Sequence, residues 1–149
     1  MNAAAATSVA QFLGVEKSVS DDALENFAGT WRRFEYKGEV NGAPVYDDYG
    51  HHPTELRATF AGVRELYPDR KLKVVFQSHT YSRTAALFDD FVDVLATADE
   101  VYLLPIYAAR EENTWGVTSE KLASAIVEKG IPASVIQTIP ACAQIVFKS

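Results

Sequence analysis

Side chains suited to catalysis or ligand binding gather in two short segments of this 149-residue sequence. One is Asp47-Asp48-Tyr49-Gly50-His51-His52, the other is His79-Thr80-Tyr81-Ser82-Arg83, and together they hold all three histidines of the chain. Arg83 offers a planar fork of N–H donors that matches a carboxylate bidentately. A helix that begins near Ser82 would add a field favouring the same anion. The second segment therefore indicates a carboxylate site.

Both segments also allow other interpretations. Histidine and carboxylate side chains suit zinc and similar ions, but neighbouring residues rarely both point at one ion, so we assign no metal ligand. Asp48 and His51 could instead contact a sugar hydroxyl and a phosphate. In the structural alternative, His52-Pro53-Thr54 is only a capped helix start. Likewise, Arg83 could be an exposed helix charge and His79 a loop residue with a structural hydrogen bond.

Several common catalytic motifs are missing. The sequence contains neither GxxxxGK[ST] nor GxGxxG, so it cannot hold a triphosphate in the usual way. Cys142, the single cysteine, lies in a tail without periodicity and forms no convincing nucleophile set with serine and histidine. The pair Arg32-Arg33 is of interest only if Arg33 reaches a phosphate. We therefore assign no catalytic residue to this chain.

The composition excludes further classes of protein. With 14 basic and 20 acidic residues the net charge is −6, which disfavours nucleic acids and anionic membranes because phosphate contact needs clustered Lys and Arg. No apolar run approaches the roughly 20 residues that span a bilayer. A lone cysteine permits no internal disulfide and favours a reducing, cytoplasmic compartment.

The hydrophobic pattern predicts the elements that must position these segments. Before residue 44 we expect a helix over 2–13, a short second helix with Ser20 as its N-cap and Gly29 after its end, and a hairpin turning at Asn41-Gly42. Thereafter helical and strand patterns alternate, and the tail from 139 shows no clear period. The expected helices cover 53–67, 82–95 and 118–129, and the expected strands cover 44–49, 72–77, 101–106 and 133–137.

This alternation predicts an α/β fold with a Rossmann-like, mostly parallel sheet and helices on both faces. Ligands bind such a sheet beyond the carboxyl ends of its strands. Both polar segments would lie there, together with a third, Arg110-Glu111-Glu112. We interpret the third as a solvated loop.

Four stretches resemble the Mur ligases, which add amino acids during bacterial cell-wall synthesis. Residues 47–55 resemble the signature of the C-terminal domain, and residues 29–35 resemble the junction with the central domain. Residues 76–84 resemble the loop that binds the incoming amino acid. Residues 2–6 are similar to the last helix of the ATPase domain. The likeness extends to about Gly130.

The resemblance implies that the chain is part of a three-domain ligase. Residues 1–30 would be the end of the central ATPase domain with linker helices. Residues 31–149 would be the C-terminal domain. The family's later strand with a Gly-Ala-Gly segment is missing after Ile136, so the domain would either be truncated or belong to a lineage with a shorter one. ATP would phosphorylate UDP-N-acetylmuramate, and L-alanine would attack the acyl phosphate. The central domain would bind most of the ATP and Mg, and this chain alone would be inactive.

Motif positions imply individual roles. Asn2 would contact adenine, and the phosphate or ribose would be contacted by Arg33, Asp48 and His51. The incoming amino acid would be held by Tyr49, His79 and Arg83. The family usually has Pro and Arg where Ser78 and Thr80 stand, so Arg83 would hold the carboxylate alone and the identity of the amino acid stays open.

Three other functions remain compatible with the sequence. The first is a murein-tripeptide recycling ligase, which shares the Asp-His-His-Pro type of motif but has a different segment at 79–83. The second is a free-standing module that binds an amino acid or a nucleotide. The third is a metal-dependent hydrolase built on Asp48, His51 and His79.

Overall fold

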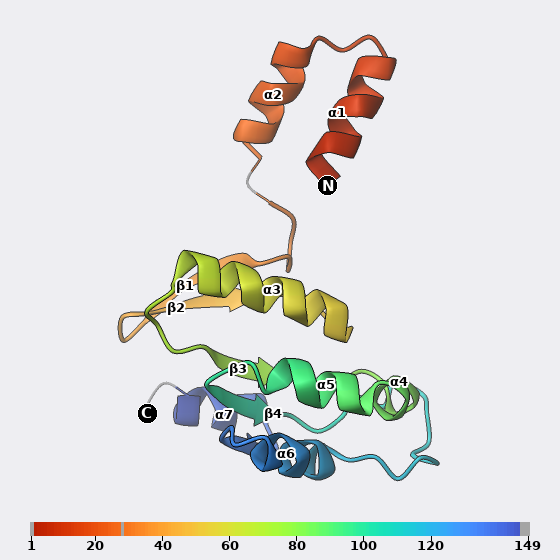
Figure 1. Cartoon of the computed structure of the whole chain (residues 1–149), viewed down its shortest axis with the longest axis vertical. Helices are drawn as coiled ribbons and strands as arrows, with labels where there is room; N and C mark the ends of the chain where they lie inside the picture. Colours follow the sequence, from red (N-terminus) through yellow and green to blue (C-terminus); the bar gives the residue numbers. More distant parts are fainter. Residues whose placement is uncertain (1, 28, 147–149) are drawn as a thin grey trace.

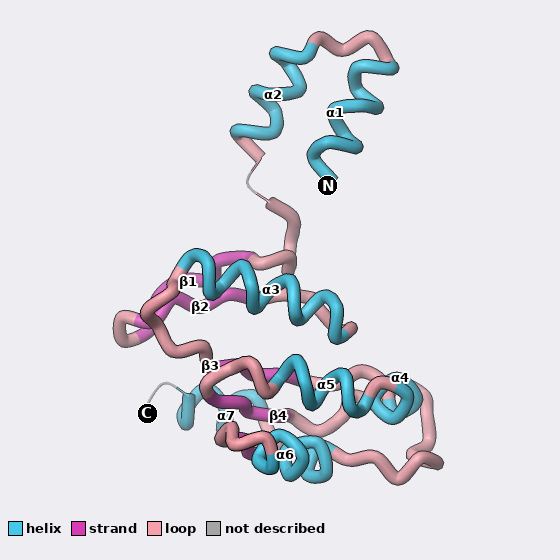
Figure 2. The backbone as a smooth tube through the Cα atoms, in the orientation of Figure 1, coloured by secondary structure: helices cyan, strands magenta, loops and turns pink. Residues whose placement is uncertain are grey.

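A computed structural model of the chain describes residues 2–27 and 29–146. Helices α1 (Asn2–Phe12) and α2 (Lys17–Glu25) contact each other and stand apart from the rest in Figures 1 and 2. No residue of α1 is buried. None of the described helices is long and apolar enough to cross a membrane.

The expected N-cap of α2 is wrong. Ser20 lies inside the helix, where its hydroxyl donates to the Glu16 carbonyl at 3.5 Å. Lys17 and Asp21 form an ion pair one turn apart, and pairs with this spacing stabilise helices. The helix therefore begins at Lys17, about one turn earlier than expected.

The expected hairpin is confirmed. Strands β1 (Glu35–Val40) and β2 (Ala43–Asp47) pair antiparallel around Asn41 and Gly42, whose φ values of 52° and 80° suit the tight turn of an Asn-Gly pair. The Phe34 and Tyr46 rings stack with centroids 4.4 Å apart. The Tyr46 hydroxyl lies 2.7 Å from that of Tyr67, so the hairpin is joined to the end of helix α3 (Pro53–Leu66).

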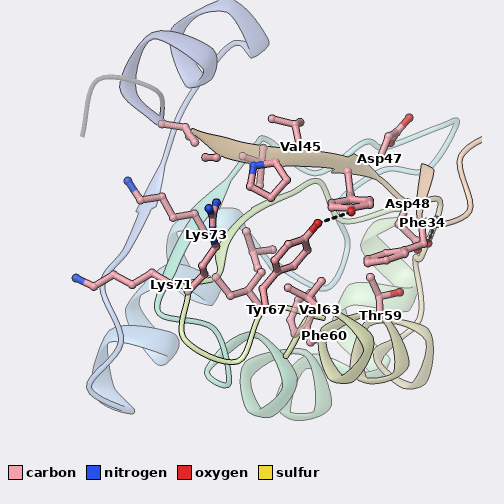
Figure 3. Close-up of a pocket in the computed structure, with 18 of the residues that line it drawn as sticks. Phe34, Val45, Asp47, Asp48, Thr59, Phe60, Val63, Tyr67, Lys71 and Lys73 are labelled. Atoms are coloured by element: carbon pink, nitrogen blue, oxygen red, sulfur yellow. Dashed lines mark hydrogen bonds between the residues drawn. The ribbon is translucent and has the colours of Figure 1, made fainter. Parts of the chain in front are cut away.

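The main sheet contains three parallel strands in the order β3 (Lys73–Phe76), β4 (Glu100–Leu103) and β5 (Ala133–Val135). The expected fourth parallel strand, 44–49, is wrong. Among the described residues β2 pairs with β1 alone, because the two-residue turn makes that partner immediately available. A cavity separates β2 from β3 (Figure 3).

Helices cover both faces of the main sheet, as expected. Val101 and Leu103 of β4 join one core with helices α5 (Phe88–Leu95) and α6 (Ser119–Glu128). Tyr102 and Leu104 point to the opposite face, where they pack with Cys142. Cys142 belongs to helix α7 (Ile139–Val146), in the tail whose sequence shows no periodicity.

The helix expected over 82–95 is divided into α4 (Tyr81–Ala86) and α5. Leu87 adopts φ −118° and ψ 25°, which lies outside the helical region and separates the two. Helix α3 packs against α5 and adds Leu56 and Phe60 to the core. The start of α3 and the short α4 lie at the same end of the domain (Figure 1).

Candidate functional site

Asp48 joins the two ends of the hairpin. One carboxylate oxygen accepts a hydrogen bond from the Phe34 amide at 2.8 Å, and the other accepts from the Gly50 amide at 2.7 Å. A Cβ atom on Gly50 would lie 2.7 Å from the Asp48 Oδ1 atom, so a side chain at position 50 would displace this carboxylate oxygen. Asp48 thus has a structural role, whether or not it also contacts a nucleotide.

Glu55 organises the start of α3. Its Oε2 atom accepts hydrogen bonds from the amides of His51 at 2.9 Å and His52 at 3.2 Å, and the His52 Nδ1 atom accepts from the Thr54 amide in return. The backbone hydrogen bond from His51 is the main reason that the pKa of Glu55 is lowered. Glu55 also lies 3.5 Å from the Arg33 guanidinium. No role was assigned to Glu55 from the sequence, although its place three residues after His52 is the spacing of a capping box.

Tyr49 lies among the residues expected to bind the nucleotide. Its ring is 5.1 Å from the Arg32 guanidinium, 5.8 Å from that of Arg33 and 5.5 Å from the His51 ring. The structure therefore gathers a hairpin cluster, defined as Arg33, Asp48, Tyr49, His51 and Glu55. Asn2 begins α1, which stands apart from this cluster in Figure 1.

The second polar segment forms a separate loop cluster, defined as His79, Thr80, Ser82, Arg83, Tyr107 and Glu111. The His79 and Tyr107 rings stack with centroids 5.2 Å apart and planes 14° apart. The Arg83 Nη1 atom donates to the His79 carbonyl at 2.6 Å. In the described part of the chain Arg83 makes no ion pair with a carboxylate, so its remaining N–H donors have no anionic partner.

The expectation of a solvated loop was wrong for Glu111, whose carboxylate is held by hydrogen bonds. Its Oε1 atom accepts from the hydroxyls of Thr80 at 2.7 Å and Ser82 at 2.6 Å, and its Oε2 atom accepts from the Ser82 amide at 2.8 Å. The Ser82 hydroxyl is the leading cause of a lowered pKa at Glu111. Its neighbours Arg110 and Glu112 are exposed.

Ser78 precedes the loop cluster and is only 3% exposed. Among the described side chains its hydroxyl is the one buried polar group without a hydrogen-bond partner. A hydroxyl in such surroundings costs free energy. Its environment suits an apolar side chain, in line with the proline that the resemblance places at this position.

A cavity of about 480 Å³ lies between the hairpin, α3 and β3. Figure 3 shows Tyr67 reaching into it, with Lys71 and Lys73 at one end and Asp47 and Asp48 at the other. Of the seven residues with expected roles, only Asp48 lines this cavity.

The loop cluster lies beyond the carboxyl ends of parallel strands, as the sheet rule predicts, whereas the hairpin cluster follows a strand outside the parallel sheet. The hairpin cluster follows β2, and the loop cluster follows β3 and β4, whose alignment continues as a parallel bridge between His79 and Tyr107. Within residues 2–27 and 29–146 no hydrogen bond, ion pair or ring contact joins one cluster to the other. No group of three or more His, Cys, Asp and Glu side chains in that part is placed to hold a metal ion.

Residues 32–148 match the model of a protein family described as Mur ligase, glutamate ligase domain. The chain belongs to this family. The match includes the hairpin cluster and the loop cluster, and it begins after α1 and α2.

Similar proteins are much longer than this chain. A UDP-N-acetylmuramate–L-alanine ligase of Agathobacter rectalis is 48% identical over 132 residues, which are 89% of this chain and 28% of that protein. The ligase of the same name from Aquifex aeolicus is 52% identical over 122 residues, which are 82% of this chain and 27% of that protein. The crystal structure of a UDP-N-acetylmuramate–alanine ligase from Thermotoga maritima superposes with a TM-score of 0.78 and 25% identity, covering 97% of this chain and 30% of that one.

Proposed function

We propose that the chain is the C-terminal domain of a UDP-N-acetylmuramate–L-alanine ligase, acting in peptidoglycan precursor synthesis in the cytoplasm. Residues 1–30 would be the end of the ATPase domain and its linker, and residues 31–149 the C-terminal domain. The proposal is supported by the name shared by the two sequence relatives, each about half identical to this chain. The observation that carries it is Arg83, fixed by a carbonyl of its own loop and unpaired with any described carboxylate.

The loop cluster is suited to hold L-alanine. Arg83 would pair with the carboxylate of the amino acid through the N–H donors that His79 does not use. The α-amine would remain free to attack the acyl phosphate that ATP forms on UDP-N-acetylmuramate. Holding the amine close to the reacting carbon can supply much of the reduction in the barrier. Thr80 provides no second cation, so the charge of Arg83 would act alone.

The hairpin cluster would close over the nucleotide that the central domain holds. Arg33 and His51 would contact phosphate or ribose, because the Arg33–Glu55 pair, at 3.5 Å on a half-exposed side chain, is weak enough for a phosphate to compete. Asp48 retains lone pairs for a ribose hydroxyl beside its two amide contacts. Tyr49, although it lies in the hairpin cluster, would contact the incoming amino acid. Asn2 would contact adenine, and Mg would be held mainly by the central domain.

The experiment uses a full-length ligase that carries this chain. We expect ADP, inorganic phosphate and UDP-N-acetylmuramoyl-L-alanine when it is given ATP, L-alanine and UDP-N-acetylmuramate, with the nucleotide products identified by mass spectrometry. Ligation of a murein tripeptide in preference to L-alanine would show that the protein is a recycling ligase instead. The 149-residue chain by itself should release no phosphate from ATP above background, because it lacks a phosphate-binding loop.

A further inference from the structure

Glu111 supplies the N-terminal cap of α4 from a distant part of the chain. Thr80, which precedes α4, makes no capping hydrogen bond with its own side chain to the helix. Instead, Glu111 accepts from Ser82 and Thr80, which lie 29 and 31 positions earlier. A helix of six residues is too short to be stable without such outside support.

The loop after β4 holds the loop after β3 through a hydrogen bond from the Gln77 side chain to the Pro105 carbonyl at 2.9 Å and at two further points. At the first point the Tyr107 amide donates to the Ser78 carbonyl at 2.9 Å, and the Tyr107 ring stacks on His79. At the second point a turn brings Glu111 back towards α4. The Glu111 amide donates to the Ala108 carbonyl at 2.9 Å, and Ala109 adopts a left-handed conformation with φ 56°. These contacts hold residues 78–82, and Arg83 follows directly after the second point.

Glu111 does not pair with Arg83 directly. Both of its carboxylate oxygens accept hydrogen bonds from Thr80 and Ser82, and the described residues show no ion pair between Glu111 and Arg83. Arg83 itself depends on this turn, because its guanidinium donates to the carbonyl of His79, the residue before Thr80. A change at Glu111 therefore reaches Arg83 only through the backbone of residues 79–82.

We propose that Glu111 is a positioning residue for the amino-acid site. It fixes the first turn of α4 in the conformation that presents Arg83 to the incoming carboxylate. This inference rests on the proposed function and adds to it a residue that makes no contact with the substrate.

The test compares Glu111→Ala and Glu111→Gln with Glu112→Ala in the full-length ligase. Glu112 is an exposed neighbouring carboxylate whose side chain has no partner in the described structure, so its variant is the matched control. We expect Glu111→Ala to raise the KM for L-alanine on the order of tenfold with little change in the KM for ATP, because misplaced groups lose much of their effect. Glu111→Gln, which keeps one acceptor oxygen, should have an intermediate effect. The control should match the wild type.

A second measurement separates positioning from direct contact. In a Thr80→Val/Ser82→Ala background, Glu111→Ala should add a clearly smaller increase in the KM for L-alanine, because both hydroxyl donors are gone and only the backbone amide of residue 82 still donates to Glu111. A full tenfold increase in that background would show direct contact with the substrate and overturn the proposal. So would an unchanged KM in the single Glu111 variants.

The activity of the wild-type ligase tests the proposed function, independently of the Glu111 variants. Failure of the wild-type ligase to use L-alanine refutes the proposed function. In that event, hydrogen exchange at the Ser82 amide of the 149-residue chain still tests the contact. Glu111→Ala should accelerate that exchange and Glu112→Ala should not. Equal protection in both variants would show that Glu111 does not hold the turn.

Discussion

Replacing Arg83 with alanine should weaken L-alanine binding while leaving ATP binding nearly unchanged. One Nη1 donor of Arg83 is used by the His79 carbonyl at 2.6 Å, and the other N–H groups remain for a carboxylate. A charge-assisted contact of this type is worth roughly 1.5–3 kcal/mol, which corresponds to an increase in KM of about ten- to a hundredfold. Thr80 cannot replace the lost charge, so the upper half of that range is expected.

The assay is steady-state kinetics of the full-length ligase with each substrate varied in turn. Arg83→Lys should recover only part of the loss, because it keeps the charge but not the planar fork. Arg110→Ala is the matched control, since Arg110 is an exposed cation on a neighbouring loop whose side chain has no partner in the described structure. Equal increases in the KM values for ATP and L-alanine would show that Arg83 acts only through domain closure, and its assignment would then be withdrawn.

Three further predictions concern stability and the nucleotide. Ser78→Ala should leave the unfolding free energy unchanged or raise it by about 1 kcal/mol, because it removes a buried hydroxyl without a partner; a clear loss in chemical denaturation would contradict this. Gly50→Ala should cost about 1–3 kcal/mol of stability and raise the KM for ATP more than that for L-alanine, since its Cβ displaces Asp48; unchanged stability would show that Asp48 adapts freely. The pKa values of Glu55, Asp99 and Glu111 are lowered by folding, so these carboxylates stabilise the fold at a pH above their ordinary pKa values, and this stabilisation is lost as the pH falls through the lowered pKa values. The melting temperature should therefore fall below about pH 4.5, and it should fall less steeply in Glu55→Gln. An identical slope in that variant would be inconsistent with the assignment.

Local signals in the sequence were sufficient for most of the elements. Asn41-Gly42 predicts a turn because only a few residue types adopt positive φ there, and the structure shows that turn. The partner of β2 could not be predicted in the same way. Alternation favours pairing with β3, whereas the short turn favours β1, and the choice depends on how α3 and the hairpin pack together. The break between α4 and α5 at Leu87 could not be predicted either, because no Gly or Pro lies at that position.

In the candidate site, too, residues marked by a local sequence pattern could be predicted, whereas residues that depend on contacts distant in the sequence could not. Asp48, His51, His79 and Arg83 could be singled out because each lies within a short run of polar residues that follows a strand. Glu55 was within reach of prediction, since the spacing from His52 to Glu55 is local. Glu111 was not, because its partners lie about thirty positions away.

The register of the parallel sheet accounts for that distant contact. Phe76 of β3 pairs with Leu103 of β4, and after both strands end His79 is still paired with Tyr107. One more residue separates Leu103 from Tyr107 than separates Phe76 from His79, and Pro105, which has no amide hydrogen to donate, lies in the longer segment. This alignment sets Tyr107 beside His79, and the turn after Tyr107 then brings Glu111 to Ser82. A shift of one residue in this register would separate Glu111 from Ser82, so the pairing of the buried strands determines how the amino-acid loop is held.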